Sequence, residues 1–232
     1  SDETYLNIVA FILQTNGRAA GPAALRADAT LTIGVASSDG VAAGQPAPAR
    51  AALAEAPEAD APTGRTRRFG DREAVELTPV TDAMLWKPPA ADWLTWRRTL
   101  DNHGYSPLDQ ITRDNVGELR LAWVISMRNG VNQTTPVVHD GVMFLANPGN
   151  VVQAIAAATG DVIWEYRYEV PPDAVTGVGA TRGLALYDDK VFLSTYDAAI
   201  VALDTRTGEQ VWRTVKADYR QGFTQTSAPI IA

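Results

Sequence analysis

The chain has 232 residues, of which 46% are hydrophobic and 8% aromatic, and it carries a formal net charge of -7. This length allows one large domain or two small ones, the acidic balance argues against a nucleic-acid partner, and no apolar run is long enough to cross a bilayer. The absence of cysteine excludes disulfides, thiolate chemistry and covalent haem attachment within these residues.

Residues 1–35 combine an acidic start with an apolar stripe. Ser1-Asp2-Glu3 is typical of a helix N-terminus, and Asn16-Gly17 of a helix end. Between them, apolar side chains recur at helical spacing, at Tyr5, Ile8, Val9 and Ile12. The segment therefore predicts an amphipathic helix of about four turns, for which the following residues offer no matching apolar stripe.

The next segment has the composition of a linker. From Ala36 to about Gly64 the residues are mostly Ala, Pro, Gly, Ser, Glu and Asp. Such a chain buries too little apolar surface to offset the entropy of ordering it. We interpret residues 36–78 as a flexible linker between two domains, and the basic group within it, Arg65, Arg67 and Arg68, as a solvated flank.

Residues 80–123 form a tryptophan-rich stretch. Thr81 to Leu85 predicts a capped helical turn, and Asp92 to Trp96 predicts a short helical or irregular piece. Leu119 to Trp123 predicts the last strand of a sheet, whose other strands would come from the far end of a longer chain that closes into a ring.

Two later segments repeat each other. Residues 154–164 (AIAAATGDVIW) and 202–212 (ALDTRTGEQVW) share Ala, Thr-Gly and Trp at fixed offsets, 48 positions apart. A period in the forties with one Trp per unit is typical of a β-propeller. The predicted fold is mainly β, a partial β-propeller of about two to three blades of four-stranded antiparallel sheet with an N-terminal helical segment.

Each repeat reads as four strands. Asp140-Gly141 and Asp188-Asp189 stand between short apolar runs and predict hairpins, because these residues tolerate positive φ. A third strand follows each hairpin, and the Thr-Gly turn leads into a fourth strand that ends in Trp. The third strands are expected at Val151 to Ile155 and at Ala199 to Leu203.

The glycines and tryptophans of the repeat predict how blades join. Gly160 and Gly208 supply turn geometry that a side chain would obstruct. Trp164 and Trp212 are expected to dock between adjacent blades, where a buried aromatic ring removes roughly 150 to 250 Å² from water. The alternative is an ordinary sandwich core, which has no need of equal spacing.

The two histidines, His103 and His139, are isolated from each other in the sequence. A histidine-based metal site is therefore not expected, and His139, which precedes Asp140-Gly141, is interpreted as a turn residue.

Several motifs follow one another in a fixed order. They are DWLTWRR at 92–98, GYSPLDQI at 104–111, Asn115 to Trp123, Thr135 to Val138 and Asp140 to Met143. Together they resemble the N-terminal part of the pyrroloquinoline quinone (PQQ) dependent alcohol dehydrogenases. Residues 202–212 match that family's blade-docking motif in full, whereas the copy at 154–164 has Ala156 where Asp is usual. Residues 1–35 resemble the end of a c-type cytochrome domain, as in a quinohaemoprotein.

The resemblance implies an enzyme that binds PQQ with Ca²⁺ and oxidises a primary or secondary alcohol. The metal would polarise the quinone, an Asp would act as base, and electrons would leave one at a time through haem c to a cytochrome. It also implies the bacterial periplasm. Residues 79–232 would be the N-terminal blades of the propeller.

Three cofactor-binding residues are carried over from the resemblance. Gln133, three residues before Pro136, stands where the family usually has a Glu near the edge of the cofactor. Arg182 stands where an Arg pairs with a PQQ oxygen, and Thr226 where a hydroxyl binds a PQQ carboxylate. Arg and Thr suit carboxylates chemically. Without the resemblance, the three would be read as a polar loop residue, a strand-edge cation and a strand residue.

The sequence departs from the family at two places. Many members have adjacent cysteines about six residues before this Arg, and Thr176-Gly177 stands there instead. Gln133 removes a charge beside an anionic cofactor. The family's Ca²⁺ ligands and base would lie beyond Ala232, and its haem attachment before Ser1, so no catalytic residue or metal ligand is assigned. We expect the chain to be part of a longer protein. By itself, this chain is expected neither to bind haem nor to oxidise alcohol.

Two further readings stay open. A non-catalytic propeller that binds protein, of the outer-membrane assembly scaffold type, shares the Thr-Gly-x-x-x-Trp repeat but lacks the tryptophan-rich stretch. A sugar dehydrogenase of the same fold would differ in substrate only.

Overall fold

The computed structural model describes residues 64–70, 76–174 and 179–231, which belong to one compact unit. The helix predicted within residues 1–35, and most of the predicted linker, lie outside the described residues. Within the part that is described, no helix is long and apolar enough to cross a membrane.

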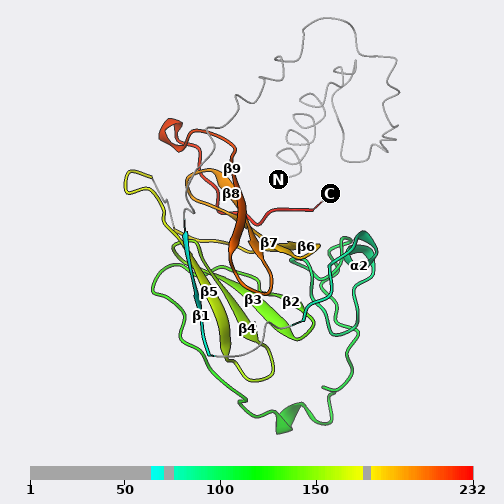
Figure 1. Ribbon diagram of the computed structural model, residues 1–232. Coiled ribbons are helices and arrows are strands. Elements are labelled where there is room, and N and C mark those ends of the chain that lie inside the picture. The colour runs from blue at the N-terminus through cyan, green and yellow to red at the C-terminus, as the bar shows by residue number, and fades with distance from the viewer. Residues whose placement is uncertain (1–63, 71–75, 175–178, 232) are drawn as a thin grey trace, which may run out of the picture. The chain divides into compact units, whose positions relative to one another are not determined.

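The first sheet contains the first copy of the repeat. Its strands lie in the order β1-β5-β4-β3-β2, and every neighbouring pair is antiparallel (Figure 1). The strands are β1 (Gly64–Arg68), β2 (Val137–His139), β3 (Val142–Asn147), β4 (Val151–Ala156) and β5 (Val162–Tyr168).

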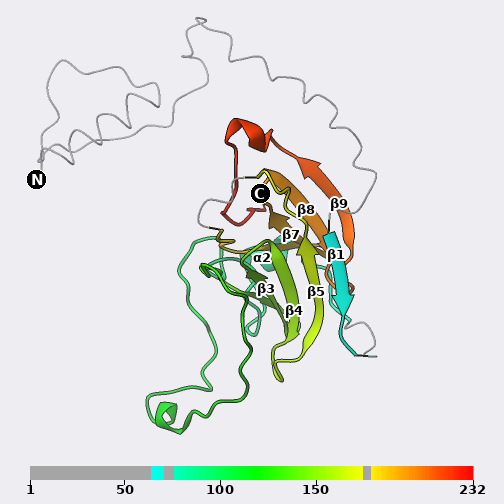
Figure 2. The ribbon, with the colours of Figure 1, turned by 90° about the vertical axis from the view of Figure 1, so that its left-hand side faces the viewer.

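The second sheet contains the second copy. It is antiparallel in the order β6-β7-β8-β9, and Figure 2 shows it beside the first sheet. The strands are β6 (Ala185–Tyr187), β7 (Lys190–Ser194), β8 (Ala199–Asp204) and β9 (Gln210–Val215). Loops and three short helical segments connect the described strands, and the helical segments are α2 (Asp82–Trp86), η2 (Val116–Glu118) and η3 (Tyr219–Gln221).

The two sheets match in detail. Asp140 and Gly141 have φ of 47° and 76°, as a two-residue hairpin between β2 and β3 requires, and Asp188 has φ of 53° at the corresponding turn. The register shifts between the third and fourth strands fall 48 residues apart, at Ala154/Ile155 and Ala202/Leu203. The prediction that Trp ends the fourth strand was wrong, because β5 and β9 continue beyond it.

Trp164 joins the two sheets. Its side chain is fully buried, its indole nitrogen donates to Thr205 O at 3.0 Å, and a Cβ placed on Gly208 would lie 2.5 Å from its ring. Trp123 docks on the first sheet in the same way. Its indole nitrogen donates to Ala157 O at 3.0 Å, and its ring lies against Gly160. The same docking contact therefore occurs twice.

Two expectations about tryptophan were not met. Trp212 packs on Phe192, with ring centroids 5.8 Å apart, but remains 40% exposed, because no described residue lies where Gly208 lies for Trp164. Residues 119–123 form no strand, since no described strand runs beside them to complete their hydrogen bonds. Of that segment, only the ring of Trp123 keeps its expected place.

Strand β1 corrects the assignment of residues 64–68 to a linker. It pairs with β5 from Gly64↔Tyr168 to Arg68↔Trp164. A Cβ on Gly64 would lie 2.4 Å from the Tyr166 ring, and Thr66 Oγ1 donates to Gly208 O at 2.7 Å. The three arginines are solvent-facing, as expected, but they lie on an ordered fifth strand that touches both sheets.

The tryptophan-rich stretch packs against the inner strands. Thr81 caps α2 as predicted, by accepting from Met84 N. Val80 forms a backbone bridge with Asp188, and Trp93 forms one with Val138. Leu85 and Leu94 join the apolar core, which includes residues of both sheets. This stretch therefore holds the two sheets together at the hairpin turns between β2 and β3 and between β6 and β7.

Asp140 adds a pH-dependent link to this packing. Burial acts to raise the pKa of its carboxyl, but hydrogen bonds from the Thr78 amide and hydroxyl, with His139 nearby, lower it below the ordinary 3.8. A lowered folded-state pKa gives stability that is present above the unfolded pKa and is lost as pH falls. Asp140→Asn should therefore cost stability at about pH 7, and the cost should shrink at about pH 3. Urea unfolding at both values measures this, and a pH-independent difference would contradict it.

Candidate functional site

The starts of the inner strands lie side by side. Thr135 N donates to Arg182 O at 3.1 Å, and Arg182 N donates to Thr226 O at 2.9 Å. Thr135 and Gly183 form a parallel bridge. These residues come from the two repeats and from the segment that follows β9, so three successive units lie side by side here. We call this row of strand starts, at Thr135, Arg182 and Thr226, the rim.

The three predicted cofactor-binding residues lie on this rim. The Arg182 guanidinium is exposed and donates from Nη1 to Thr226 Oγ1. Gln133 is also exposed, and both Gln133 and Arg182 line a cavity of about 580 Å³. Thr226 does not line the cavity itself, but the next residue, Ser227, does. The structure thus brings a cation, an amide and hydroxyls to one cavity.

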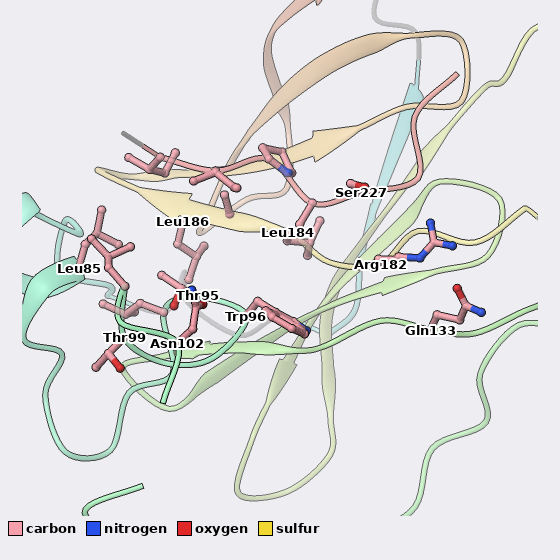
Figure 3. Close-up of a pocket in the computed structure, with 17 residues that line it drawn as sticks. Leu85, Thr95, Trp96, Thr99, Asn102, Gln133, Arg182, Leu184, Leu186 and Ser227 are labelled. Atoms are coloured by element: carbon pink, nitrogen blue, oxygen red, sulfur yellow. The ribbon is translucent and has the colours of Figure 1, made fainter. Parts of the chain in front are cut away.

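The cavity has a polar end and an apolar body. Figure 3 shows Arg182, Gln133 and Ser227 toward one end, and Leu85, Thr95, Thr99 and Asn102 toward the other. Trp96 lies between them with 58% of its surface exposed. Apolar side chains supply most of the wall, among them Leu94, Leu100, Leu184, Leu186, Ile230 and Ile231. A flat organic anion, with carboxylates at the Arg182 end, matches this distribution.

Sequence reasoning missed part of this wall. The motif at 92–98 includes Trp96 without assigning it to a site, and no motif includes Ser227. No local pattern in the sequence marks either residue as part of a cavity. The exposed position of a large aromatic residue in a cavity is visible only in three dimensions.

His139 was wrongly interpreted as a turn residue. It lies in β2 with 1% of its surface exposed, and its Nδ1 is 2.7 Å from Asp92 Oδ2. Its Nε2 is 2.6 Å from Thr78 O and 3.3 Å from Asp140 Oδ2. The imidazole therefore joins the tryptophan-rich stretch to the first hairpin.

Asp92, His139 and Asp140 are close enough to be considered as metal ligands. A bound Zn²⁺ would hold each ligand atom at about 2.0 to 2.2 Å and at tetrahedral angles, which separates the ligand atoms by more than 3 Å. The 2.7 Å contact between His139 and Asp92 is a hydrogen bond instead. The contacts of this cluster link the tryptophan-rich stretch to the first hairpin.

A five-stranded and a four-stranded antiparallel sheet, docked through a tryptophan and with their inner strands aligned at one rim, define the chain as part of a β-propeller. Residues 93–213, more than half of the chain, match the family described as "PQQ: Glucose/ethanol/alcohol dehydrogenase, beta-propeller domain". The chain belongs to this family, as its motifs indicated.

Individual relatives agree. The chain is 40% identical over 151 residues to the dehydrogenase subunit of the quinone-dependent alcohol dehydrogenase of Gluconacetobacter polyoxogenes. The matched region covers 61% of this chain and 20% of that protein. The structure of quinohemoprotein alcohol dehydrogenase ADHIIG from Pseudomonas putida HK5 superposes with a TM-score of 0.59 at 32% identity, over 67% of this chain and 24% of that one. A europium-containing methanol dehydrogenase superposes with a TM-score of 0.60 at 30% identity, over 65% of this chain and 27% of that one. The chain thus spans 20% to 27% of the length of these relatives.

Proposed function

We propose that this chain forms the first blades of a PQQ-dependent alcohol dehydrogenase and supplies one side of its cofactor site. The observation that carries the proposal is the pairing of the exposed Arg182 guanidinium with Thr226 at a cavity that Gln133 also lines. The family membership and the named relatives support the reaction type.

The residues present fit PQQ. The cofactor carries three carboxylates on a flat ring system, and the Arg182 fork, the Thr226 hydroxyl and the Gln133 amide are donors for carboxylate or quinone oxygens. The apolar body of the cavity suits the ring. When bound, PQQ supplies the two-electron acceptor for alcohol oxidation. The part of this chain is to bind and orient the cofactor, and the catalytic base and metal ligands would come from other blades.

Other features of the complete enzyme follow the same proposal. A metal ion beside PQQ would be Ca²⁺, although one structural neighbour is a europium-containing enzyme. Electrons would pass to haem c in a domain preceding the propeller and then to a cytochrome. The enzyme would act on small alcohols in the periplasm. Residues 1–232 alone would not oxidise alcohol, because they supply only part of the site.

The alternative of a protein-binding scaffold is the weaker proposal. It explains the docked tryptophans equally well, but it gives no role to an exposed Arg182 at the rim of a cavity. The named relatives are dehydrogenases. A sugar in place of an alcohol would require the same cofactor and the same three residues.

PQQ binding to Arg182→Gln tests the proposal. Loss of a charge-assisted contact to a carboxylate costs about 1.5 to 3 kcal/mol, so the affinity should fall roughly 10- to 100-fold. The matched control is Arg206→Gln, which makes the same change of charge at the turn between β8 and β9, away from the cavity lining. Quenching of tryptophan fluorescence by added PQQ gives the affinities. The proposal fails if wild type shows no saturable binding, or if both variants bind alike.

A further inference from the structure

The backbone that carries Arg182 is held by a buried polar cluster outside the cavity. Asn150, in the turn between β3 and β4, is fully buried. Its Nδ2 donates to Thr181 Oγ1 at 3.1 Å and to Ser194 O at 3.4 Å, and its Oδ1 accepts from Tyr196 N at 2.9 Å. One side chain of the first sheet thus holds both the residue before Arg182 and the turn between β7 and β8.

Tyr196 completes the cluster from the second sheet. It is 1% exposed, and its hydroxyl donates to Gly179 O. The same hydroxyl accepts from Thr181 Oγ1 and from Gly149 N, each at 3.4 Å. Asn150 and Tyr196 therefore hold Gly179 and Thr181, which flank Ala180 just before Arg182.

The two copies of the repeat differ at the positions of these two residues. A shift of 48 positions relates Asn150 to Ala198 and Tyr196 to Pro148. Asn150 and Ala198 share the same left-handed backbone, with φ of 55° and 58°, so the turn does not need the Asn side chain for its shape. Both differences therefore fall at one junction, where the segment leading to Arg182 bonds to turns of both sheets.

The Arg182 side chain itself has little support. It is exposed, and its guanidinium bonds to the Thr226 hydroxyl. The direction of the guanidinium therefore depends on how firmly residues 179–182 are held. A displacement of about 1 Å in such a binding group is enough to weaken its contact strongly.

We propose that Asn150 and Tyr196 are positioning residues, which fix the 179–182 backbone so that Arg182 meets a carboxylate of the cofactor. The role of Arg182 toward PQQ rests on the proposed function, whereas the fixing of the backbone does not. Neither residue touches the cavity; each acts through Arg182.

A double-mutant cycle tests the effect on binding. Tyr196→Phe removes only the hydroxyl, and Asn150→Gly removes the side chain while keeping a residue suited to positive φ. Each should weaken PQQ binding about tenfold in the wild-type background and less than about twofold in the Arg182→Gln background. The control is Tyr166→Phe, which removes a hydroxyl that bonds Gln210 between the same sheets, away from the rim, and should leave the affinity unchanged.

Hydrogen exchange at the Arg182 amide tests the positioning without cofactor. In Tyr196→Phe and Asn150→Gly this amide should exchange at least about tenfold faster, while amides of β3 and β4 keep their rates. Absence of PQQ binding by wild type would refute the function proposed for Arg182, and the exchange rates would still decide the positioning role. Unchanged exchange, or equal losses of affinity in both arginine backgrounds, would overturn it.

Discussion

Gly208→Ala should unfold the protein at much lower denaturant than Gly141→Ala, although both replace a glycine of nearly the same backbone conformation. Gly208 has φ of 72° and Gly141 has φ of 76°. In either place, alanine in the left-handed region costs about 1 to 2 kcal/mol. A Cβ on Gly141 meets nothing within 4 Å, so this strain should be its whole cost.

At Gly208 the methyl group must also displace a buried ring. Its Cβ would lie 2.5 Å from Trp164 Cδ2, and Trp164 is fully buried with its indole nitrogen bonded to Thr205 O. Overpacking of this kind adds about 1 to 3 kcal/mol. Gly160→Ala should behave like Gly208→Ala, because Trp123 covers Gly160 in the same manner. Urea unfolding of the three variants gives the comparison, and equal costs for Gly141 and Gly208 would show that tryptophan docking adds nothing.

The same contact explains why the fold was predictable from the sequence. Each repeat unit contains Asp-Gly or Thr-Gly turns, a small residue and a tryptophan. Their spacing is fixed within the unit, so the sequence alone indicates the order of strands and turns. Trp164 needs Gly208, which is 44 residues away, but the repeat itself supplies that relation. The repeat could not predict the exposure of Trp212, since the residue that would cover it is not among those described.

Features made by unique long-range contacts were not predictable. Strand β1 is five residues long and contains three arginines, and it is a strand because β5 and Tyr166 receive it. His139 is buried because Asp92, 47 residues earlier, meets its ring. Neither relation has a period or a local motif. A short polar segment carries no hydrophobic pattern that could fix a strand.

The candidate site was only partly accessible from the sequence. Gln133, Arg182 and Thr226 came from the family resemblance, and the structure places them on one rim. Asn150 and Tyr196 belong to none of the motifs, and the bond between them joins positions 46 residues apart. Comparison of the two repeats contained the missing signal, since each position has a nonpolar residue in the other copy.

Arg213→Met should be the other strongly destabilising change, because it strips the charged partner from a buried carboxylate. Asp197 is 1% exposed, and its Oδ2 accepts from Arg213 Nη2 at 2.7 Å and from Tyr168 Oη at 2.6 Å. Burial and the bond to Asp197 raise the pKa of Tyr168 to about 12, so its hydroxyl stays protonated but brings no positive charge. Loss of one partner of a buried pair costs about 3 to 5 kcal/mol.

Comparison variants separate this effect from a general loss of packing. Arg206→Met breaks a pair between an exposed arginine and the half-buried Asp204 and should cost at most about 1 kcal/mol. The double variant Arg213→Met with Asp197→Asn removes the stranded charge and should regain a large part of the stability that Arg213→Met loses, because the remaining amide needs only neutral partners such as Tyr168 and Thr195. Urea unfolding measures each variant. If the double variant is less stable than Arg213→Met, the arginine acts through packing, and the ion pair between β9 and the turn between β7 and β8 does not hold this edge of the sheets together.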